Sequence, residues 1–457
     1  MGAAIVDIDS YREQLLDPGL RRGDEAKFNT LLGSDSKGQR MALDLIIRNA
    51  RLSGAGADNP MVDIGVRGGI IVAVGPNLAG DGPEHDAHGK LVSPGLIESH
   101  FHLDKAMIIE RVPMQPDRMV RDHMKRTASI KHTFTAEDIY ARAEATIEQC
   151  LLHGVTHMRT QVEVDPNVGL LGFEVIEQLR KDYAWAIDIQ PCVFLQEGWT
   201  DVPGADENLV HCLDRGAPVV GGGIRYDKDG PGQIRRVFEL AQHYDADVDF
   251  HLDGGYDVKN PDYPQVCEIT DRIRWQGRVA FGHGSRFSCM PVKEQAAVGK
   301  RLGESGVSVA VLPATDLFNG GRHMEHSVMR GVTDANTLIE HGANCTLSTN
   351  NVLNPFTPYG DCSLTRIANL YANVVQRYGP KDLGVCFEMI TDRAAKLMRL
   401  TDYGIEVGKA ADLVVWNEEL PSDVVAKCAL PLAGFKRGRR IFLRELPTLQ
   451  RPPKTQL

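Results

Sequence analysis

The sequence lacks any Cys-x-x-Cys pair, although its 457 residues include nine cysteines. Zinc deaminases with a His-x-Glu and a Pro-Cys-x-x-Cys motif need such a pair to hold their metal, so that class is excluded. The cysteines are odd in number, scattered and mostly set among apolar neighbours. We therefore expect reduced core thiols in a cytoplasmic protein, because disulfides belong to oxidising compartments.

The chain also lacks an extended basic cluster and a long apolar run. Its formal net charge is −10, and the short basic run at 436–440 is typical of a solvated face, so we predict no nucleic-acid partner. No stretch approaches about 18 uninterrupted apolar residues, so we predict no membrane span. Residues 1–9 have neither a basic nor a long apolar region of the kind found in signal peptides, which also favours a cytoplasmic location.

Short apolar runs rich in β-branched residues alternate with helical stretches along the middle of the chain. The runs are 96–102, 156–164, 186–195, 219–224, 247–251, 278–283, 307–312 and 345–348. One intervening helix begins at a capping box, Thr135 to Asp138, and ends at Gly154. This alternation predicts an α/β protein with a (β/α)8 TIM barrel. A doubly wound sheet is the alternative, but no Gly-x-Gly-x-x-Gly follows a strand.

Both ends of the chain carry further strand patterns. We expect strands near 45–47, 62–66 and 70–74, and a glycine-punctuated strand pair at 404–416. Neither end has enough strands to bury a sheet face alone, so we predict that both ends build one small composite β-sandwich domain. The predicted organisation is an N-terminal arm (1–42), the composite domain (43–94 and 401–457) and a barrel catalytic domain (95–400).

The most informative motif is His100 and His102, one residue apart at the end of the first barrel run. Alternate residues of a strand point to the same side, so both imidazoles can reach one metal ion. Barrel enzymes place their sites at the C-terminal ends of the strands. His251, His283 and the Asn350–Asn351 pair fall at or after such ends, and so does Gln196.

Three imidazoles and one further ligand leave a coordination position for water, which is the catalytic pattern of a metal site. A divalent metal lowers the pKa of bound water towards about 7, and the resulting hydroxide can attack an sp2 carbon. His283 suits polarisation of the electrophile or both this role and proton transfer, and the alternatives are a fourth metal ligand or a structural histidine. Lys105 is either a donor to the substrate or a surface lysine, and the Gln196 amide suits a planar heterocycle or amide. Asp253 and Asp104 either orient site groups or form salt bridges at the barrel rim.

Several of these segments resemble the amidohydrolase superfamily, in particular the branch that contains cytosine deaminase and N-isopropylammelide amidohydrolase. The resemblance lies in 94–105, 159–164, 194–198, 354–361 and 404–413, and it extends over roughly residues 43–420. It implies one divalent metal, Zn2+ with Fe2+ or Mn2+ as alternatives, and a homo-oligomer. It implies metal ligands at His100, His102, His251 and the strand-eight acid position, which is Asn350. It also implies that His283 lies beside the reacting carbon.

The same resemblance implies that Gln196 contacts the substrate and that Lys105 matches a substrate-side lysine of triazine-degrading relatives. With Asp253 and Asn351, these residues form the expected substrate-binding set. His283, Asn350 and Lys105 form the expected catalytic set.

Two departures from the family pattern bear on the chemistry. Asn350 stands where the family carries aspartate, and an amide cannot accept and return the proton of the attacking water. Losing such a base commonly costs about 10²–10⁴-fold in rate. The change is either an engineered substitution that traps substrate or a natural variant that uses another base. Gly254 stands where cytosine deaminase carries a proton-shuttling glutamate, which argues against cytosine as the substrate.

The sequence thus predicts a metal-dependent hydrolase that cleaves a C–N bond, other than a peptide bond, in a small neutral cyclic substrate by means of a metal-bound hydroxide. Hydrolytic deamination of an amino-heterocycle and opening of a cyclic amide are the expected reactions. Hydrolysis of an exocyclic amide, urea or carbamate is the alternative within enzymes. A catalytically dead ligand-binding relative is the alternative outside them.

Overall fold

The computed structural model describes residues 41–54, 59–114 and 122–450. Most of the predicted N-terminal arm, residues 1–40, lies outside this part of the chain. Two compact units divide the chain, one of 1–42 with 79–81 and one of 43–78 with 82–457. In the first unit, β1 (Met41–Ala42) pairs in parallel with β5 (Gly80–Asp81). Among the described helices, none combines the length and the apolar character that a membrane crossing requires.

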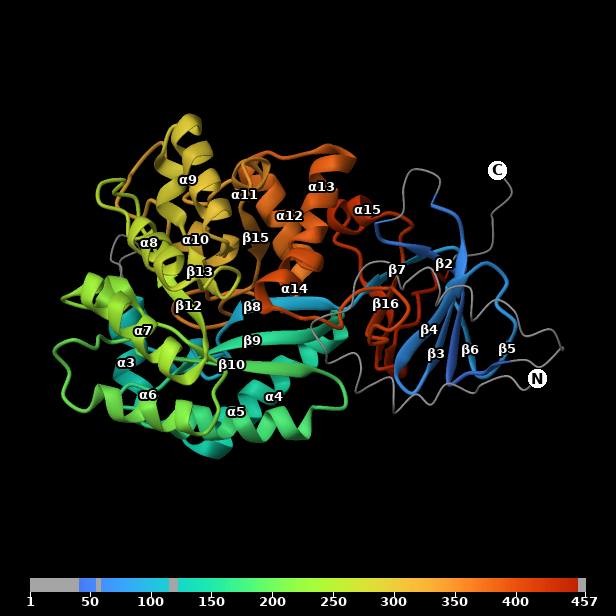
Figure 1. The fold of residues 1–457 in the computed structure, drawn as a ribbon, viewed down its shortest axis with the longest axis horizontal. Coiled ribbons are helices and arrows are strands. Elements are labelled where there is room, and N and C mark those ends of the chain that lie inside the picture. The colour runs from blue at the N-terminus through green and yellow to red at the C-terminus, as the bar shows by residue number, and fades with distance from the viewer. Residues whose placement is uncertain (1–40, 55–58, 115–121, 451–457) are drawn as a thin grey trace. The chain divides into compact units, whose positions relative to one another are not determined.

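An eight-stranded parallel sheet forms the centre of the larger unit (Figure 1). Its strands follow one another in chain order, each hydrogen-bonded to the next. They are β8 (Leu96–Phe101), β9 (Val155–Glu163), β10 (Asp188–Phe194), β11 (Val219–Val220), β12 (Asp247–Leu252), β13 (Val279–His283), β14 (Val307–Val311) and β15 (Asn344–Leu347). The predicted barrel strands are confirmed, with ends shifted by a few residues.

The ring closes between its first and last strands. Phe101 and Asn350 form a parallel bridge, and the His102 N–H donates to the Asn350 carbonyl at 2.9 Å. Buried Glu98 in β8 accepts hydrogen bonds from Ser348 Oγ and from the backbone N–H of residue 349. These bonds fix the chain after β15 beside the first strand, so the loops after β8 and β15 meet at one end of the barrel.

Helices surround the barrel strands (Figure 1). They are α3 (His123–Lys131), α4 (Ala136–Leu152), α5 (Leu171–Asp182), α6 (Ala205–Asp214), α7 (Gly230–Tyr244), α8 (Tyr263–Ile273), α9 (Val292–Glu304), α10 (Pro313–Asn319), α11 (Ala335–Glu340), α12 (Leu364–Val375), α13 (Gly379–Glu388) and α14 (Asp392–Met398). Thr135 caps α4 as predicted, accepting from the Asp138 N–H at 3.2 Å. The buried faces of these helices and the strands share one large apolar core.

A second sheet joins strands from both ends of the chain, as predicted for the composite β-domain. Its order is β18-β17-β16-β7-β2-β3-β4, and β6 pairs with β2. The strands are β2 (Leu45–Leu52), β3 (Val62–Arg67), β4 (Ile70–Gly75), β6 (Glu84–Asp86), β7 (Leu91–Pro94), β16 (Leu413–Trp416), β17 (Pro431–Lys436) and β18 (Arg439–Leu443), and α15 (Pro421–Ala426) lies between β16 and β17. Leu45, Ile64, Leu413 and Phe435 share its separate core, so neither chain end buries this face alone.

Two strand predictions were too long. The run 219–224 forms a strand only over β11, because the glycines that follow let the chain approach β12 closely. A Cβ on Gly221 would lie 2.2 Å from the Asp249 carbonyl oxygen. Of the predicted pair at 404–416, only β16 is a strand. Gly404 and Gly408 have φ of 124° and 93°, which breaks extended pairing before it.

The junction between the second sheet and the barrel holds a buried charge cluster. Lys436 Nζ lies 2.7 Å from Asp188 and 2.6 Å from Asp412. His157 lies 3.5–3.6 Å from the same two carboxylates. This group has a geometry that metal ions use, but the ammonium of Lys436 already supplies its cation. We therefore interpret it as a structural junction.

Candidate active site

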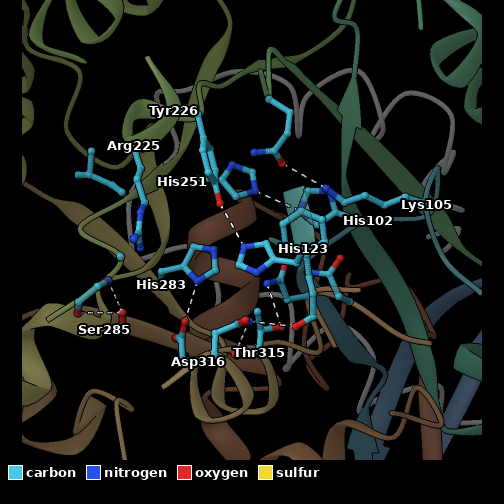
Figure 2. Close-up of a pocket in the computed structure, with 18 of the residues that line it drawn as sticks. His102, Lys105, His123, Arg225, Tyr226, His251, His283, Ser285, Thr315 and Asp316 are labelled. Carbon is cyan, nitrogen blue, oxygen red and sulfur yellow. Dashed lines mark hydrogen bonds and ion pairs between the residues drawn. The ribbon is translucent and has the colours of Figure 1, made fainter. Parts of the chain in front are cut away.

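Three imidazoles, those of His100, His102 and His251, converge at the C-terminal end of the barrel strands. Figure 2 shows two of them, His102 and His251, in the pocket wall. The Nε2 atom of His251, in β12, lies 3.2 Å from Nε2 of His100 and 3.1 Å from Nε2 of His102. Nitrogen ligands of a tetrahedral zinc ion, each about 2.0–2.1 Å from the metal, lie roughly 3.3 Å apart. The spacing of these nitrogens therefore fits three ligands of one divalent cation.

A glycine makes room for this cluster. Gly282 in β13 faces His100, and a Cβ at that position would lie 2.6 Å from Cε1 and 2.8 Å from Nε2 of the imidazole. Such distances are far inside van der Waals contact. The His100 ring can therefore hold its place only because position 282 carries no side chain.

The surroundings of the three imidazoles favour their neutral form. Burial is the largest cause that lowers the pKa of each, and Lys105 and neighbouring histidines lower the pKa of His102 further. Neutral imidazole keeps a lone pair on one ring nitrogen, which a metal ion requires and a protonated ring cannot offer. The electrostatics of the site therefore favour a cation between the rings.

An ionised carboxylate orients His100 from behind. Asp249 Oδ1 lies 3.3 Å from His100 Nδ1, and Arg159 donates to Asp249 Oδ2 at 3.1 Å. Burial alone would raise the pKa of Asp249, but the charges and hydrogen bonds of His100 and Arg159 outweigh burial and lower it. The Gln161 side-chain amide also lies 3.2 Å from Nδ1. In the tautomer that donates its Nδ1 proton to Asp249, the lone pair of His100 lies on Nε2, toward the cluster.

The Asn350–Asn351 pair lines the same pocket. Asn350 has a φ of 63°, and its Nδ2 donates to Thr315 Oγ1 at 3.1 Å. Its Oδ1 is buried and has no hydrogen-bond partner among the described residues. Asn351 Oδ1 accepts from Asn354 Nδ2 at 2.7 Å. The Asn350 amide oxygen is therefore an available neutral donor at the strand-eight position.

His283 stands at the end of β13 and pairs with an acid that the sequence did not suggest. Its Nδ1 lies 2.8 Å from Asp316 Oδ1, in α10. Asp316 is 6% exposed, and its Oδ2 is buried with no hydrogen-bond partner among the described residues. Both residues line the pocket, and Asp316 is the only carboxylate among its described lining residues. The pair therefore places an imidazole and a carboxylate in contact at the pocket wall.

Lys105 is buried rather than on the surface. Its Nζ donates to Glu163 and, at 3.2 Å, to Gln196 Oε1, and it lies 4.5 Å from the centre of the Phe356 ring. Lys131 Nζ lies 2.6 Å from the other oxygen of Glu163. Burial would raise the pKa of Glu163, but the two lysines lower it to about 2. A fixed carboxylate thus holds Lys105 beside Gln196 at the pocket wall.

Asp253 does not line the pocket, in contrast to the prediction of substrate contact. Its carboxylate oxygens accept from the backbone N–H groups of Asp262 and Tyr263, both at 2.9 Å, and Arg286 Nε lies 3.2 Å away. The residue has a φ of 50°, which turns its side chain into the loop after β12. Asp253 therefore shapes that loop, and Asp104 likewise accepts from the backbone N–H of Glu163.

The pocket over these groups has an empty volume of about 650 Å³, including its opening to solvent. Sequence reasoning missed much of its lining. The additional residues are His123, Arg225, Tyr226, Leu252, Gly255, Tyr256, Ser285, Thr315, Asp316, Asn319 and Phe356. His123 Nε2 lies 3.3 Å from the Tyr226 hydroxyl and its ring packs on Phe356. One available signal was the polar pair 315–316, three residues after the seventh predicted strand.

Residues 200–429 match the Amidohydrolase family. The chain belongs to this family. The predicted resemblance and the predicted barrel are thereby confirmed. As an amidohydrolase, the chain is a hydrolase. Its four candidate ligand positions lie in β8 (His100), directly after β8 (His102), in β12 (His251) and after β15 (Asn350).

Among the relatives of this amidohydrolase is the N-isopropylammelide isopropyl amidohydrolase of Pseudomonas sp. (strain ADP). It is 28% identical over 416 residues, which cover 88% of this chain and 98% of the relative. A pterin deaminase of Rhizobium rhizogenes is 23% identical and covers 84% of this chain and 88% of its own length. The structure of 5-methylcytosine deaminase from Klebsiella pneumoniae with 5-fluorocytosine superposes with a TM-score of 0.84 at 27% identity. That match covers 90% of this chain and 100% of the other.

Proposed function

We propose that this amidohydrolase removes an amino group from a small nitrogen heterocycle by metal-dependent hydrolysis. The observation that carries the proposal is the convergence of three imidazoles on one point beside a pocket in which His283 contacts Asp316. The relatives named for 5-methylcytosine, pterin and N-isopropylammelide support a planar heterocyclic substrate.

Zinc is the proposed metal, with Fe2+ or Mn2+ as alternatives. His100, His102 and His251 would hold it, and the unpartnered amide oxygen of Asn350 would be a weak fourth donor. When bound, such a cation supplies a nucleophile from water near neutral pH and polarises the substrate. The donor set fits this role, because three imidazoles leave a coordination position open.

His283 is the proposed proton carrier. Asp316 accepts the proton on Nδ1, which leaves the lone pair of His283 on Nε2. From the pocket wall, Nε2 can accept a proton from the attacking water and return it to the departing amine. The negative charge of Asp316 stabilises the imidazolium form between these two transfers.

Asn350 cannot take part in that transfer. Of the two explanations for the asparagine, we favour a natural variant that uses another base over an engineered inactive one. The support is the pairing of His283 with Asp316, which brings a carboxylate from helix α10 to the same pocket. Asn350 then contributes only as a neutral donor and through its hydrogen bond to Thr315.

Gln196 and Lys105 are proposed to orient the substrate together with Asn351, which lies in the segment after β15. The Gln196 amide offers donors and an acceptor in one plane, which suits the edge of a heterocycle. Glu163 fixes Lys105 beside it, so the ammonium can donate to a ring carbonyl or nitrogen without reorganising. Phe356 supplies an apolar surface beside the ammonium.

Zinc reconstitution and a substrate panel test the proposal. The purified protein is stripped with a chelator, reloaded with Zn2+, Fe2+ or Mn2+, and assayed for ammonia or amine release from aminopyrimidines, aminotriazines, pterins and cyclic amides. We expect no activity without metal and release of ammonia from at least one amino-heterocycle with it. Failure to bind one metal ion per chain would refute the proposal and leave a ligand-binding relative.

Release of an alkylamine instead of ammonia is the second candidate reaction, favoured by the relative named for an isopropyl amidohydrolase. The same panel with N-alkylated triazines distinguishes it. The cytoplasmic location, the homo-oligomer and the domain boundaries at 43, 95 and 401 stay predictions. Light scattering of the reloaded protein measures the oligomer.

A further inference from the structure

We infer that the pocket selects a heterocycle that carries a carboxylate, and that the guanidinium of Arg225 binds this group. The inference rests on the proposed function, because it names the substrate class of the same pocket. Arg225 is exposed at the pocket mouth, lines the pocket, and was not among the residues expected from the sequence.

The backbone around Arg225 is anchored to the metal-ligand strand. The residue lies in a short 3₁₀ turn, Ile224–Tyr226, in which the Tyr226 N–H donates to the Gly223 carbonyl at 3.0 Å. Directly before it, the Gly222 carbonyl accepts from the N–H of His251 at 2.9 Å. The Ile224 side chain is buried beneath the turn. The position of Arg225 relative to the imidazole cluster is therefore fixed by hydrogen bonds and not by a loose loop.

The guanidinium lies beside Gly255 at the pocket wall. Arg225 Nη1 lies 3.4 Å from where a Cβ of Gly255 would stand, and no atom lies within 4 Å of a Cβ built on Gly254. Figure 2 places Arg225 on the same side of the pocket as His283 and Ser285. The glycines leave open space between the guanidinium and the reacting groups, and no protein side chain fills it from this segment.

Arg225 has no hydrogen bond or ion pair with any described residue, and the acids on the loops around it have other partners. Asp227 accepts from the N–H groups of residues 199 and 200, and Asp229 caps α7 and faces Arg235. Asp253 is held by two backbone N–H groups and Arg286. The guanidinium is therefore a positive charge that no residue of the described part of the chain compensates.

The other fixed charges of the pocket are compensated. Lys105 pairs with Glu163, and Asp316 pairs with His283. A neutral heterocycle would leave Arg225 facing solvent, whereas a carboxylate on the ring would form a charge-assisted, bidentate pair with it. The chemistry of this wall thus matches an anionic substituent on the side of the ring that faces the opening.

Matched substrate pairs test the inference. The pairs are cytosine with cytosine-5-carboxylate, and pterin with pterin-6-carboxylate, each assayed for ammonia release by zinc-loaded protein and titrated calorimetrically. We expect the carboxylated member of at least one pair to have a kcat/KM at least 10-fold higher. Arg225→Gln should lower that value about 10–100-fold, mainly through KM, and change the neutral member less than 3-fold. Arg225→Lys should restore part of the loss.

Arg235→Gln is the control, because it removes the same charge from an exposed arginine of the neighbouring helix that does not line the pocket. Equal effects of Arg225→Gln on both members, or no preference in wild type, would overturn the inference and leave the proposed function standing. Calorimetric preference for the carboxylated member without ammonia release from any compound would support the subsite and overturn the proposed function. Absence of both binding and release for all four compounds would overturn both.

Discussion

Replacing Asp316 with asparagine tests the proposed proton-transfer role of His283 without changing the candidate metal ligands. The change keeps the size of the side chain and an oxygen that can accept from His283 Nδ1, but it removes the negative charge. The Asp316 side chain contacts His283 and forms no hydrogen bond with His100, His102 or His251 among the described residues, so the metal content should stay at the wild-type value. Only the stabilisation of the imidazolium form of His283 should be lost.

The magnitude follows from the geometry. Nδ1 and Oδ1 lie 2.8 Å apart, so the two charge centres are about 4 Å apart, and unit charges at that distance interact by about 4 kcal/mol at an effective dielectric of 20. Asparagine retains a neutral hydrogen bond worth about 1 kcal/mol. The remaining loss of about 3 kcal/mol corresponds to a fall in kcat of about 10²-fold, with KM nearly unchanged.

A double-mutant cycle with Asn350→Asp makes the test specific. If Asp316 supplies the base that position 350 lacks, restoring aspartate at 350 should raise the rate of the Asp316→Asn protein far more than the rate of wild type. Steady-state ammonia release at saturating substrate and zinc content of each variant are the measurements. A wild-type rate for Asp316→Asn, or equal gains from Asn350→Asp in both backgrounds, would refute the role of Asp316.

The remaining predictions concern the metal cluster and the sheet junction. Gly282→Ala should weaken zinc binding at least 10-fold by displacing His100, whereas Gly384→Ala, in an open helical position, should not, as measured by competition with a chelating dye. Zinc at 100 times its dissociation constant should stabilise the stripped protein by about 2.7 kcal/mol in urea unfolding, and no stabilisation would contradict a folded-state site. Burial and Lys436 lower the pKa of His157 from 6.5 to about 3, so stability should fall as the pH drops below 6.5, when only the unfolded chain takes up the proton. Between pH 6.5 and 5, wild type should lose about 2 kcal/mol more than His157→Gln, and an equal loss would show that His157 is not the cause.

Patterns within single strands predicted the site residues that lie in the barrel strands or at their ends. Alternation put His100 and His102 on one side of β8, and the ends of parallel strands brought His251 and His283 to the same end of the barrel. Thr135 capped its helix because a capping box depends on residues within one turn. In each case the sequence within a few residues predicted the local position. Closure of the barrel then brought the strand ends together.

The site residues that sequence analysis missed lie in short helices and turns, where the hydrophobic periodicity of the sequence does not predict the course of the backbone. Asp316 lies in α10, a seven-residue helix too short for a helical pattern to be recognised. Arg225 follows three glycines that stay hydrogen-bonded to the neighbouring strands, and the chain turns into a short 3₁₀ helix only at Ile224, within the predicted strand. Asp253 was expected in the pocket, but its positive φ turns it toward the backbone of 262–263.

The predicted loss of acids at positions 350 and 254 and the unpaired guanidinium of Arg225 change the net charge of the pocket in the same direction. The sequence predicts that Asn350 stands at the position of a family aspartate and Gly254 at that of a cytosine deaminase glutamate, and each such replacement would make the site one charge more positive. Arg225 adds a positive charge without an internal partner among the described residues. A pocket altered in this way repels a cationic substrate and gains affinity for an anionic one, because electrostatic complementarity is restored when the ligand brings the negative charge. The preference for a carboxylated substrate would then follow from the loss of protein carboxylates. Asn350→Asp should therefore weaken binding of cytosine-5-carboxylate or pterin-6-carboxylate more than binding of the neutral parent. Equal weakening of both, measured by calorimetry on the zinc-loaded variant, would show that the two features are unrelated.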